Sequence, residues 1–434
     1  MSLIQTTLES KLEALQCHFT WDLHASRTRL NCLRDQLEDI GTEEGYSWLG
    51  HIYNLQGYIY FQLGLSKDAC RFLSRAAEAF RQMRNTVSDE GPWLMVNYGN
   101  LAWLHYQRKE RAECQAYLLK IDALINEYPS PSQGELHAET YAEKAWTLMK
   151  FSADKELVAD YFQRAIRMQP DMVEWHTSHV IVLESAFRHS DTGVPAEILE
   201  KMNIAKEHDP ENLYLAALYL EACAKKGRNV ESEVRELARR VLRKPVSSYS
   251  GIVPLLRLYR IYVSLDEAID LAEEALERNP DKRYLKSCAA LCYRRISQRK
   301  DNPLQHSMID RAISLQREVI TLYPLSSLPL EIYLANIYAD CNNQDEADQI
   351  YEELLKRDLD PECAQMLYHY YAKYLHFHRQ ETYKSIEYHM RAVAIRQQSS
   401  YRKKSINTLE RIRERNRNRM CQKIDEFLNN LKKN

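Results

Sequence analysis

The sequence predicts an all-α protein, a solenoid of stacked helical hairpins. Two observations predict this fold: apolar residues recur at helical spacing along the chain, and small residues and prolines mark the same places in one unit after another. The 434 residues include only 11 Gly and 13 Pro, which favours long helices with short connections. Stacked hairpins bury their apolar faces against their neighbours and leave a concave side, where we expect the function to lie.

The repeat is clearest in residues 330–356. One face of a first helix carries its apolar residues, Leu330, Tyr333, Leu334, Ile337, Tyr338 and Cys341. Asn342 and Asn343 end this helix, because both tolerate left-handed turn geometry. A second apolar stripe then runs from Ala347 to Leu355. Ala335 and Ala347 stand 12 residues apart, the spacing of the small residues that let paired helices approach closely in tetratricopeptide (TPR) repeats.

The same template predicts nine hairpins in succession. Prolines at 170, 210, 245, 280 and 324 follow the later units, because proline cannot continue a helix. The predicted hairpins are 46–83, 93–127, 137–170, 173–209, 212–245, 249–280, 283–324, 328–360 and 362–398, and residues 297–305 lengthen the seventh. We expect four regions: an N-terminal helical cap (1–45), N-terminal and central TPR units (46–245), C-terminal TPR units (246–400) and a basic C-terminal helix (401–434).

Charge and composition exclude several classes of protein. The formal net charge is −2, so no whole-molecule field attracts nucleic acid or a membrane, although residues 402–434 carry +7. Residues 1–9 show no secretory signal, and no apolar stretch approaches the roughly 20 residues of a membrane-spanning helix. The ten Cys occur singly, as expected of reduced thiols. We therefore expect a soluble, intracellular protein that binds no membrane.

The sequence contains no motif that indicates catalysis. A Gly-rich phosphate loop, a nucleophile elbow and a paired-His metal motif are all missing. Cys288 and Cys292 have the spacing of half a zinc site, but no further Cys/His pair supplies the other ligands. His376 and His378 would point to different sides of a helix. We therefore expect no enzyme activity, no metal and no cofactor.

Short motifs outside the repeat template resemble those of one family. They are C-H-F-T-W at 17–21, G-N-x-A-W-x-x-Y at 99–106, E-x-x-W-x-L-x-K at 143–150, L-C-Y-R at 291–294 and K-S-I-N-x-L at 404–409. In this order they resemble the interferon-induced proteins with tetratricopeptide repeats, the IFIT family. The resemblance runs from about residue 3 to about residue 415. Known members of the family run longer and end in another helical pair.

The resemblance implies RNA binding. Family members are interferon-induced, cytoplasmic effectors of antiviral innate immunity, and several capture the 5′ end of foreign single-stranded RNA in a basic tunnel. Lys and Arg suit the phosphates of such a strand, and aromatic faces suit its unstacked bases. The resemblance therefore implies single-stranded RNA as the partner, with other IFIT-like proteins as further partners, and it implies no binding of DNA.

Matched residue by residue, the resemblance implies a set of RNA-binding positions. Trp146 and Lys150 match the 5′-end pocket, and Asn212 and Tyr214 match its polar and aromatic pair. The remaining candidates are Gln36, Arg188, Arg257, Arg260 and Tyr284. Counting back from Pro210 places the family's triphosphate-binding arginine at Arg188, whereas counting forward from Pro170 places it at Ser185.

The chain also departs from the family at several pocket positions. The Arg-Tyr pair of the sixth unit aligns with Val253 and Pro254, while Arg257 and Arg260 follow one and two turns later. A tyrosine of the third unit is replaced at about Lys155, and a glutamine of the seventh unit at Cys288. These departures weaken a conventional triphosphate pocket.

Several of these features also have a purely structural interpretation. Trp146 serves equally well as core, Arg257 and Arg260 as an exposed helix face, and the basic helix from Arg402 as a solvated terminal helix. At the level of function, the alternative is a TPR scaffold for protein partners in the antiviral response, without recognition of RNA ends. A positive inner face would favour RNA, and a neutral or acidic one would favour protein.

Overall fold

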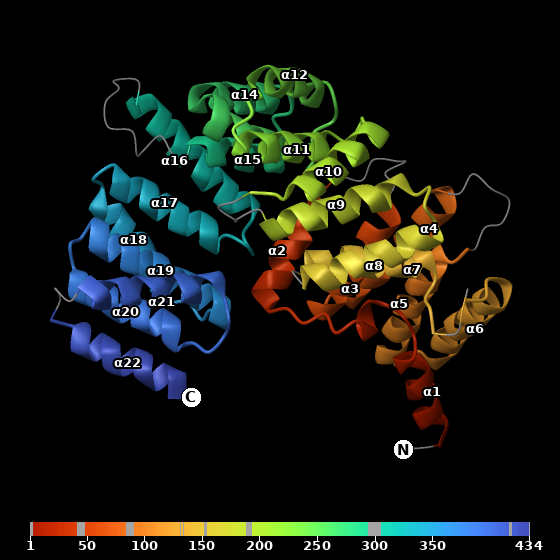
Figure 1. Cartoon of the computed structure of the whole chain (residues 1–434). Coiled ribbons are helices and arrows are strands. Elements are labelled where there is room, and N and C mark those ends of the chain that lie inside the picture. Colours follow the sequence, from red (N-terminus) through yellow and green to blue (C-terminus); the bar gives the residue numbers. More distant parts are fainter. Residues whose placement is uncertain are drawn as a thin grey trace. The chain divides into compact units, whose positions relative to one another are not determined.

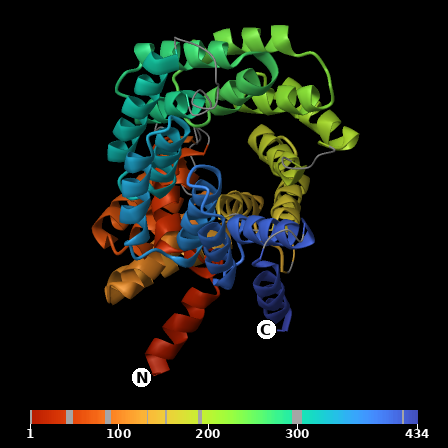
Figure 2. The ribbon, with the colours of Figure 1, turned by 90° about the vertical axis from the view of Figure 1, so that its left-hand side faces the viewer.

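A computed structural model describes residues 3–40, 48–83, 91–130, 132, 134–151, 154–187, 193–293, 305–415 and 419–433. These residues form helices and connecting turns, with no strand among them, and the expected all-α TPR fold is confirmed. The chain divides into two compact units, residues 1–271 and 272–434, and the division falls inside helix α14 (Leu265–Arg278). Figures 1 and 2 show the helices from two directions. Nowhere in the described ranges does a helix have the length and apolarity needed to cross a membrane.

Unit 1 contains a short N-terminal region followed by helical hairpins. The N-terminal region is α1 (Leu3–Glu13), the 3-10 turn η1 (His18–Thr20) and α2 (Arg27–Glu38). The hairpins are α3 (Leu49–Gln62) with α4 (Ser66–Met83), α5 (Trp93–Gln107) with α6 (Arg111–Glu127), α7 (Ala138–Lys150) with α8 (Lys155–Met168), α9 (Val173–Phe187) with α10 (Ala196–His208), and α11 (Leu213–Lys225) with α12 (Glu231–Leu242). A sixth pair begins with α13 (Ile252–Leu258), continues through the π-helical turn η2 (Tyr259–Val263) and ends with α14.

Unit 2 continues the same pattern. Its helices are α15 (Arg283–Tyr293), α16 (Gln305–Leu322), α17 (Leu328–Asp340), α18 (Gln344–Leu355), α19 (Pro361–Phe377), α20 (Thr382–Ala394), α21 (Ser400–Arg415) and α22 (Cys421–Lys433). The region expected as one basic helix, 401–434, thus contains two helices. Ile424 and Leu428 of α22 are buried with Leu409 of α21, which explains why this segment folds back as a second apolar helix.

The first helices of the hairpins are more deeply buried than the second ones. In α3 every residue from Leu49 to Ile59 is buried, whereas in α6 the buried residues are restricted to one stripe: Cys114, Leu118, Ile121 and Leu124. A first helix packs against its own partner and against the neighbouring hairpins, so it has little solvent-facing surface. Polar side chains on first helices therefore lie either in buried hydrogen-bond networks or at cavities.

The C-H-F-T-W motif forms one such network in unit 1. The backbone N–H of His18 donates to Asn100 Oδ1 (3.0 Å), and the His18 ring contacts Asn100 Nδ2 (3.0 Å) and Thr147 Oγ1 (3.1 Å). Burial lowers the pKa of His18 to about 3, so the ring stays neutral. A Cβ on Gly99 would come within 2.9 Å of Cys17 Cβ. The motifs at 17–21 and 99–106 are therefore two halves of one packing contact that joins η1 to α5 and α7.

Candidate nucleic-acid interface

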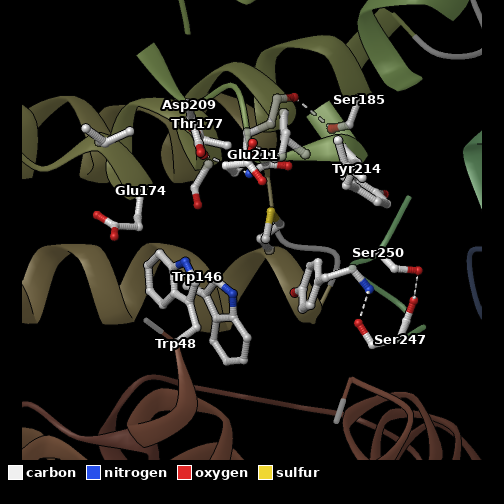
Figure 3. Close-up of a pocket in the computed structure, with 18 of the residues that line it drawn as sticks. Trp48, Trp146, Glu174, Thr177, Ser185, Asp209, Glu211, Tyr214, Ser247 and Ser250 are labelled. Atoms are coloured by element: carbon white, nitrogen blue, oxygen red, sulfur yellow. Dashed lines mark hydrogen bonds between the residues drawn. The ribbon is translucent and has the colours of Figure 1, made fainter. Parts of the chain in front are cut away.

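A cavity of about 730 Å³ opens in unit 1 on the side of the first helices. Its walls come from α7, α8 and α9, from the turn before α11, and from the segment between α12 and α13 (Figure 3). Trp48, which precedes α3, completes the wall below α7. We call this cavity the α7–α11 pocket. It brings together segments that are separated by more than a hundred residues in the sequence.

Local hydrogen bonds position the polar residues of the turn before α11. Asn212 caps that helix, since its Oδ1 accepts from the backbone N–H of Leu215 (3.0 Å). Its Nδ2 donates to Asp209 Oδ2 (3.0 Å), and Thr177 Oγ1 on α9 donates to the same oxygen (3.2 Å). The predicted residue Asn212 therefore holds the turn in place and also lines the pocket.

Aromatic rings form one wall of the α7–α11 pocket. Trp146 stacks on Trp48, with ring centroids 5.7 Å apart and an interplanar angle of 12°. Trp146 is only 1% exposed, so it packs as a core residue as well as lining the cavity. Tyr214 and Tyr249 meet edge to face at 6.0 Å, and both remain half-buried. These two tyrosines therefore offer more accessible ring surface to a ligand than Trp146 does.

Lys150 lies between the two aromatic groups. Its Nζ is 5.0 Å from the Trp146 ring centroid and 4.8 Å from that of Tyr249, and it donates a hydrogen bond to the Tyr249 hydroxyl. Its backbone carbonyl accepts from Arg29 Nη2 (2.9 Å), which fixes the end of α7. A cation between two rings gains from both ring quadrupoles, so this placement is favourable even in a half-buried site.

The described lining residues carry balanced charge. The cationic members are Lys150, Lys155 and Lys244, and the anionic members are Glu174, Asp209 and Glu211. Lys244 Nζ pairs with the Glu211 carboxylate (2.5 Å), and this hydrogen bond lowers the pKa of Glu211. Lys155 donates to the backbone carbonyl of Ser185. A positively charged lining would favour RNA as the ligand, and this balanced lining does not by itself favour it.

Four of the nine candidates line the α7–α11 pocket: Trp146, Lys150, Asn212 and Tyr214. Lys155, singled out as a departure from the family, and Ser185, the alternative to Arg188, line it as well. Arg188 itself lies outside the described residues.

The other four candidates lie elsewhere. Gln36 is exposed on α2 and does not line the pocket. Arg257 is no exposed face residue, because its Nε lies 2.9 Å from both carboxylate oxygens of the buried Glu221. Arg260 lies half-buried in the π-helical turn η2, and Tyr284 is half-buried on α15 of unit 2.

Sequence reasoning missed several lining residues, mainly Trp48, Glu174, Lys244 and Tyr249. They flank the helices instead of lying in the middle of their apolar stripes, so helical periodicity gives no signal for them. All four lie at or just before the start of a first helix. Trp48 and Glu174 lie at the starts of α3 and α9, and Lys244 and Tyr249 lie in the segment before α13. In the described ranges, no group of three or more His, Cys, Asp or Glu is arranged to hold a metal ion.

Comparisons with known proteins agree with this architecture. A family model for the tetratricopeptide repeat matches residues 334–361. Interferon-induced protein with tetratricopeptide repeats 2 of Mus musculus is 26% identical, over 94% of this chain and 87% of the relative. Antiviral innate immune response effector IFIT1 of Homo sapiens is 24% identical, over 93% and 87%.

Solved structures of human IFIT1 also resemble the chain. The human IFIT1 dimer with m7Gppp-AAAA has a TM-score of 0.70 at 24% identity, covering 94% of this chain and 91% of that one. The human IFIT1 dimer with PPP-AAAA has a TM-score of 0.68 at 24% identity, covering 94% and 90%. At these identities, the structural likeness supports the fold.

Proposed function

Because this chain is a member of the family of interferon-induced proteins with tetratricopeptide repeats, we propose that it binds single-stranded RNA near the 5′ end in the α7–α11 pocket. It acts as a cytoplasmic antiviral effector that sequesters RNA without catalysis. The observation that carries this proposal is the convergence of Trp146, Lys150, Asn212 and Tyr214 on one cavity. These residues lie on α7 and at the start of α11, and the family motifs in the sequence predict all four of them.

The pocket has the chemistry for a terminal nucleotide. Tyr214 and Tyr249 present ring surface on which an unpaired base stacks, a contact worth about 1–3 kcal/mol. Asn212 and Asp209 offer hydrogen-bonding atoms for base edges and ribose hydroxyls. Lys155 is exposed, so its ammonium is accessible to the backbone phosphates of a strand leaving the cavity.

Charge reversal in the pocket tests this proposal. Lys150→Glu and Lys155→Glu each place a carboxylate where a strand would pass, so we expect RNA affinity to fall by at least about ten-fold. Lys373→Glu is the control, since Lys373 is exposed like Lys155 and lies beside a tyrosine like Lys150, but on α19 of unit 2. The measurement is the electrophoretic mobility shift of one single-stranded RNA with a capped, triphosphate or hydroxyl 5′ end. Native-like shifts for both pocket variants would refute the assignment.

A second candidate function is a scaffold whose pocket takes a segment of another family member. The balanced charge of the described lining residues favours this scaffold function. A cavity without net charge gives no electrostatic advantage to a negatively charged nucleic acid, and it can accept a protein segment. The two functions differ in their salt dependence. RNA affinity falls steeply with salt through counterion release. The scaffold function replaces RNA binding if two results are obtained together. The RNA mobility shifts are insensitive to salt, and a purified family relative binds the native chain but not the Lys150→Glu variant.

A further inference from the structure

Helix α2 contacts two walls of the α7–α11 pocket that lie far apart in the sequence. In its first turn, Arg29 Nη2 donates to the backbone carbonyl of Lys150 (2.9 Å), the last residue of α7. At its C-terminal end, the backbone carbonyl of Asp39 accepts from the backbone N–H of Ser248 (3.0 Å), in the segment between α12 and α13. None of the described residues of α2 lines the pocket. The helix therefore supports both walls from outside the cavity.

Helix α2 is itself held in place within unit 1. Ser26 Oγ accepts from the backbone N–H of Arg29 (3.2 Å) and so caps the helix. The hydroxyl of Tyr60 on α3 donates to Glu38 Oε1 (2.8 Å). Three leucines of α2 are buried in the same core cluster as Trp146: Leu30, Leu33 and Leu37. These contacts fix α2 against α3 and the core, so the helix can serve as a support for other groups.

The contact with Arg29 holds the end of α7. The carbonyls in the last turn of a helix have no partner within the helix, and a cation at this end also interacts favourably with the helix dipole. The Arg29 guanidinium supplies both the hydrogen bond and the charge at Lys150. The Lys150 side chain therefore reaches the Tyr249 hydroxyl from a backbone position that Arg29 holds.

The contact with Asp39 holds the segment that carries Tyr249. Ser248 directly precedes Tyr249, and both lie outside any helix, between α12 and α13. The hydrogen bond from Ser248 to α2 limits the movement of this segment. The Tyr249 ring also packs against the core cluster that contains the leucines of α2. The contacts thus form a closed circuit: α2 holds Lys150 and Ser248, and the Lys150 ammonium bonds to the residue after Ser248.

We infer that Arg29 is a positioning residue for RNA binding. It acts through Lys150 and does not touch the ligand itself. The inference rests on the proposed function and adds a residue to the same site. Tyr249 is one of the two accessible rings of the pocket, so a shift of this ring or of the Lys150 ammonium removes favourable contacts with a base or a phosphate. A displacement of about 1 Å is enough to weaken a site of this kind.

The test is a double-mutant cycle on RNA affinity, measured by fluorescence anisotropy with one labelled single-stranded RNA. Arg29→Ala should weaken binding by about three- to ten-fold in the native chain. In the Lys150→Ala background the same substitution should change the affinity by less than about two-fold, because the side chain that Arg29 positions is absent. In the Lys155→Ala background the full effect should remain, since Lys155 lies on α8 and donates to Ser185.

Two further variants separate positioning from a general effect on α2. Arg27→Ala removes an exposed arginine from the same turn and should leave the affinity unchanged. Arg29→Lys keeps a cationic donor near the Lys150 carbonyl, so it should recover part of the affinity that Arg29→Ala loses. Urea denaturation of each variant shows whether the chain remains folded. If Arg29→Ala does not fold, the same cycle is measured with Arg29→Lys.

An unchanged affinity of the Arg29 variant overturns the inference. An equal loss in the native, Lys150→Ala and Lys155→Ala backgrounds overturns it as well, because a purely structural role would act equally in all three. In either case the proposed function still stands if Lys150→Glu weakens RNA binding. Absence of RNA binding by the native chain refutes the proposed function itself and the inference with it.

Discussion

Each unit of the chain has a hollow along its first helices, and the two hollows differ in the segments that line them. The α17–α19 groove of unit 2, about 370 Å³, is lined by Tyr333, Asn336, Ile337, Asp340, Tyr370, Lys373, Tyr374, Phe377 and His378. These residues all lie on α17 or α19 or at the C-cap of α19. In the α7–α11 pocket, by contrast, the connecting segments contribute Asp209, Glu211 and Lys244.

The comparison shows what the connections between hairpins add to a hollow built from first helices. Both hollows have the same basic elements from first helices: a lysine beside aromatic rings, Lys150 with Trp146 in unit 1 and Lys373 with Tyr370 in unit 2. Only the α7–α11 pocket adds segments that precede the next helices, and these segments bring half of its described charged groups: Asp209, Glu211 and Lys244. The helices therefore contribute the lysine and aromatic rings of each hollow, and the connections between hairpins add charged groups to the α7–α11 pocket.

The largest expected difference concerns stability. Trp146 is 1% exposed, whereas Phe377 at the rim of the α17–α19 groove is 67% exposed. Trp146→Ala removes a fully packed ring and should lower the free energy of unfolding by about 3–5 kcal/mol. Phe377→Ala should change it by less than about 0.5 kcal/mol. Urea denaturation followed by circular dichroism measures both. Equal shifts for the two variants would show that Trp146 is not a core residue.

The next difference concerns RNA affinity. Tyr249→Ala removes one of the two accessible rings of the α7–α11 pocket, so we expect a loss of about 1–3 kcal/mol in binding, as for other base-stacking aromatics. Tyr370→Ala removes the corresponding ring in unit 2 and should leave the affinity unchanged. Anisotropy titrations of labelled single-stranded RNA give both values. If Tyr370→Ala weakens binding as much as Tyr249→Ala, the distinction between the two hollows fails.

A further expected effect is a pH dependence that distinguishes a buried carboxyl group from the buried histidines. Burial raises the pKa of Glu143 in unit 1 to about 8, although Asn54 Nδ2 donates to its carboxyl (2.8 Å). The folded chain thus keeps this proton where the unfolded chain loses it, so stability falls as the pH rises from 4.5 to about 8. Glu143→Gln should remove a slope of about 1.4 kcal/mol per pH unit in this window.

A pair of buried histidines in unit 2 has the opposite sign, as does His18 in unit 1. Ser405 Oγ bridges His369 Nδ1 (3.0 Å) and His389 Nδ1 (3.1 Å), and burial lowers the pKa of His369 to about 3 and that of His389 to about 4. Their neutral forms are favoured on folding, so stability is lost as the pH falls below about 6.5. Urea midpoints should change for Glu143→Gln between pH 4.5 and about 8, and should not change in the lower window below pH 4.5. A change confined to the lower window would contradict this assignment.

Helical periodicity and local stop signals were sufficient for most of the fold. The hairpin predicted at 328–360 contains α17 and α18, and that predicted at 93–127 matches α5 and α6 to within a residue. Both signals depend on neighbours a few residues apart, so they can be read directly from the sequence. The basic segment 401–434 was interpreted as one helix because its charge hid the apolar stripe of α22.

The candidate site was only partly predictable, because its decisive contacts join distant residues. Family motifs led to Trp146, Lys150, Asn212 and Tyr214, which line the pocket. No local pattern places Trp48 against Trp146, joins Arg257 to Glu221 thirty-six positions away, or sets three carboxylates opposite the tryptophans. The sequence by itself determined the repeat, most of the hairpin positions and the family resemblance, since these follow from short-range spacing and motifs. Tertiary structure alone decided which charges meet in the pocket, because burial and electrostatic pairing depend on positions in space.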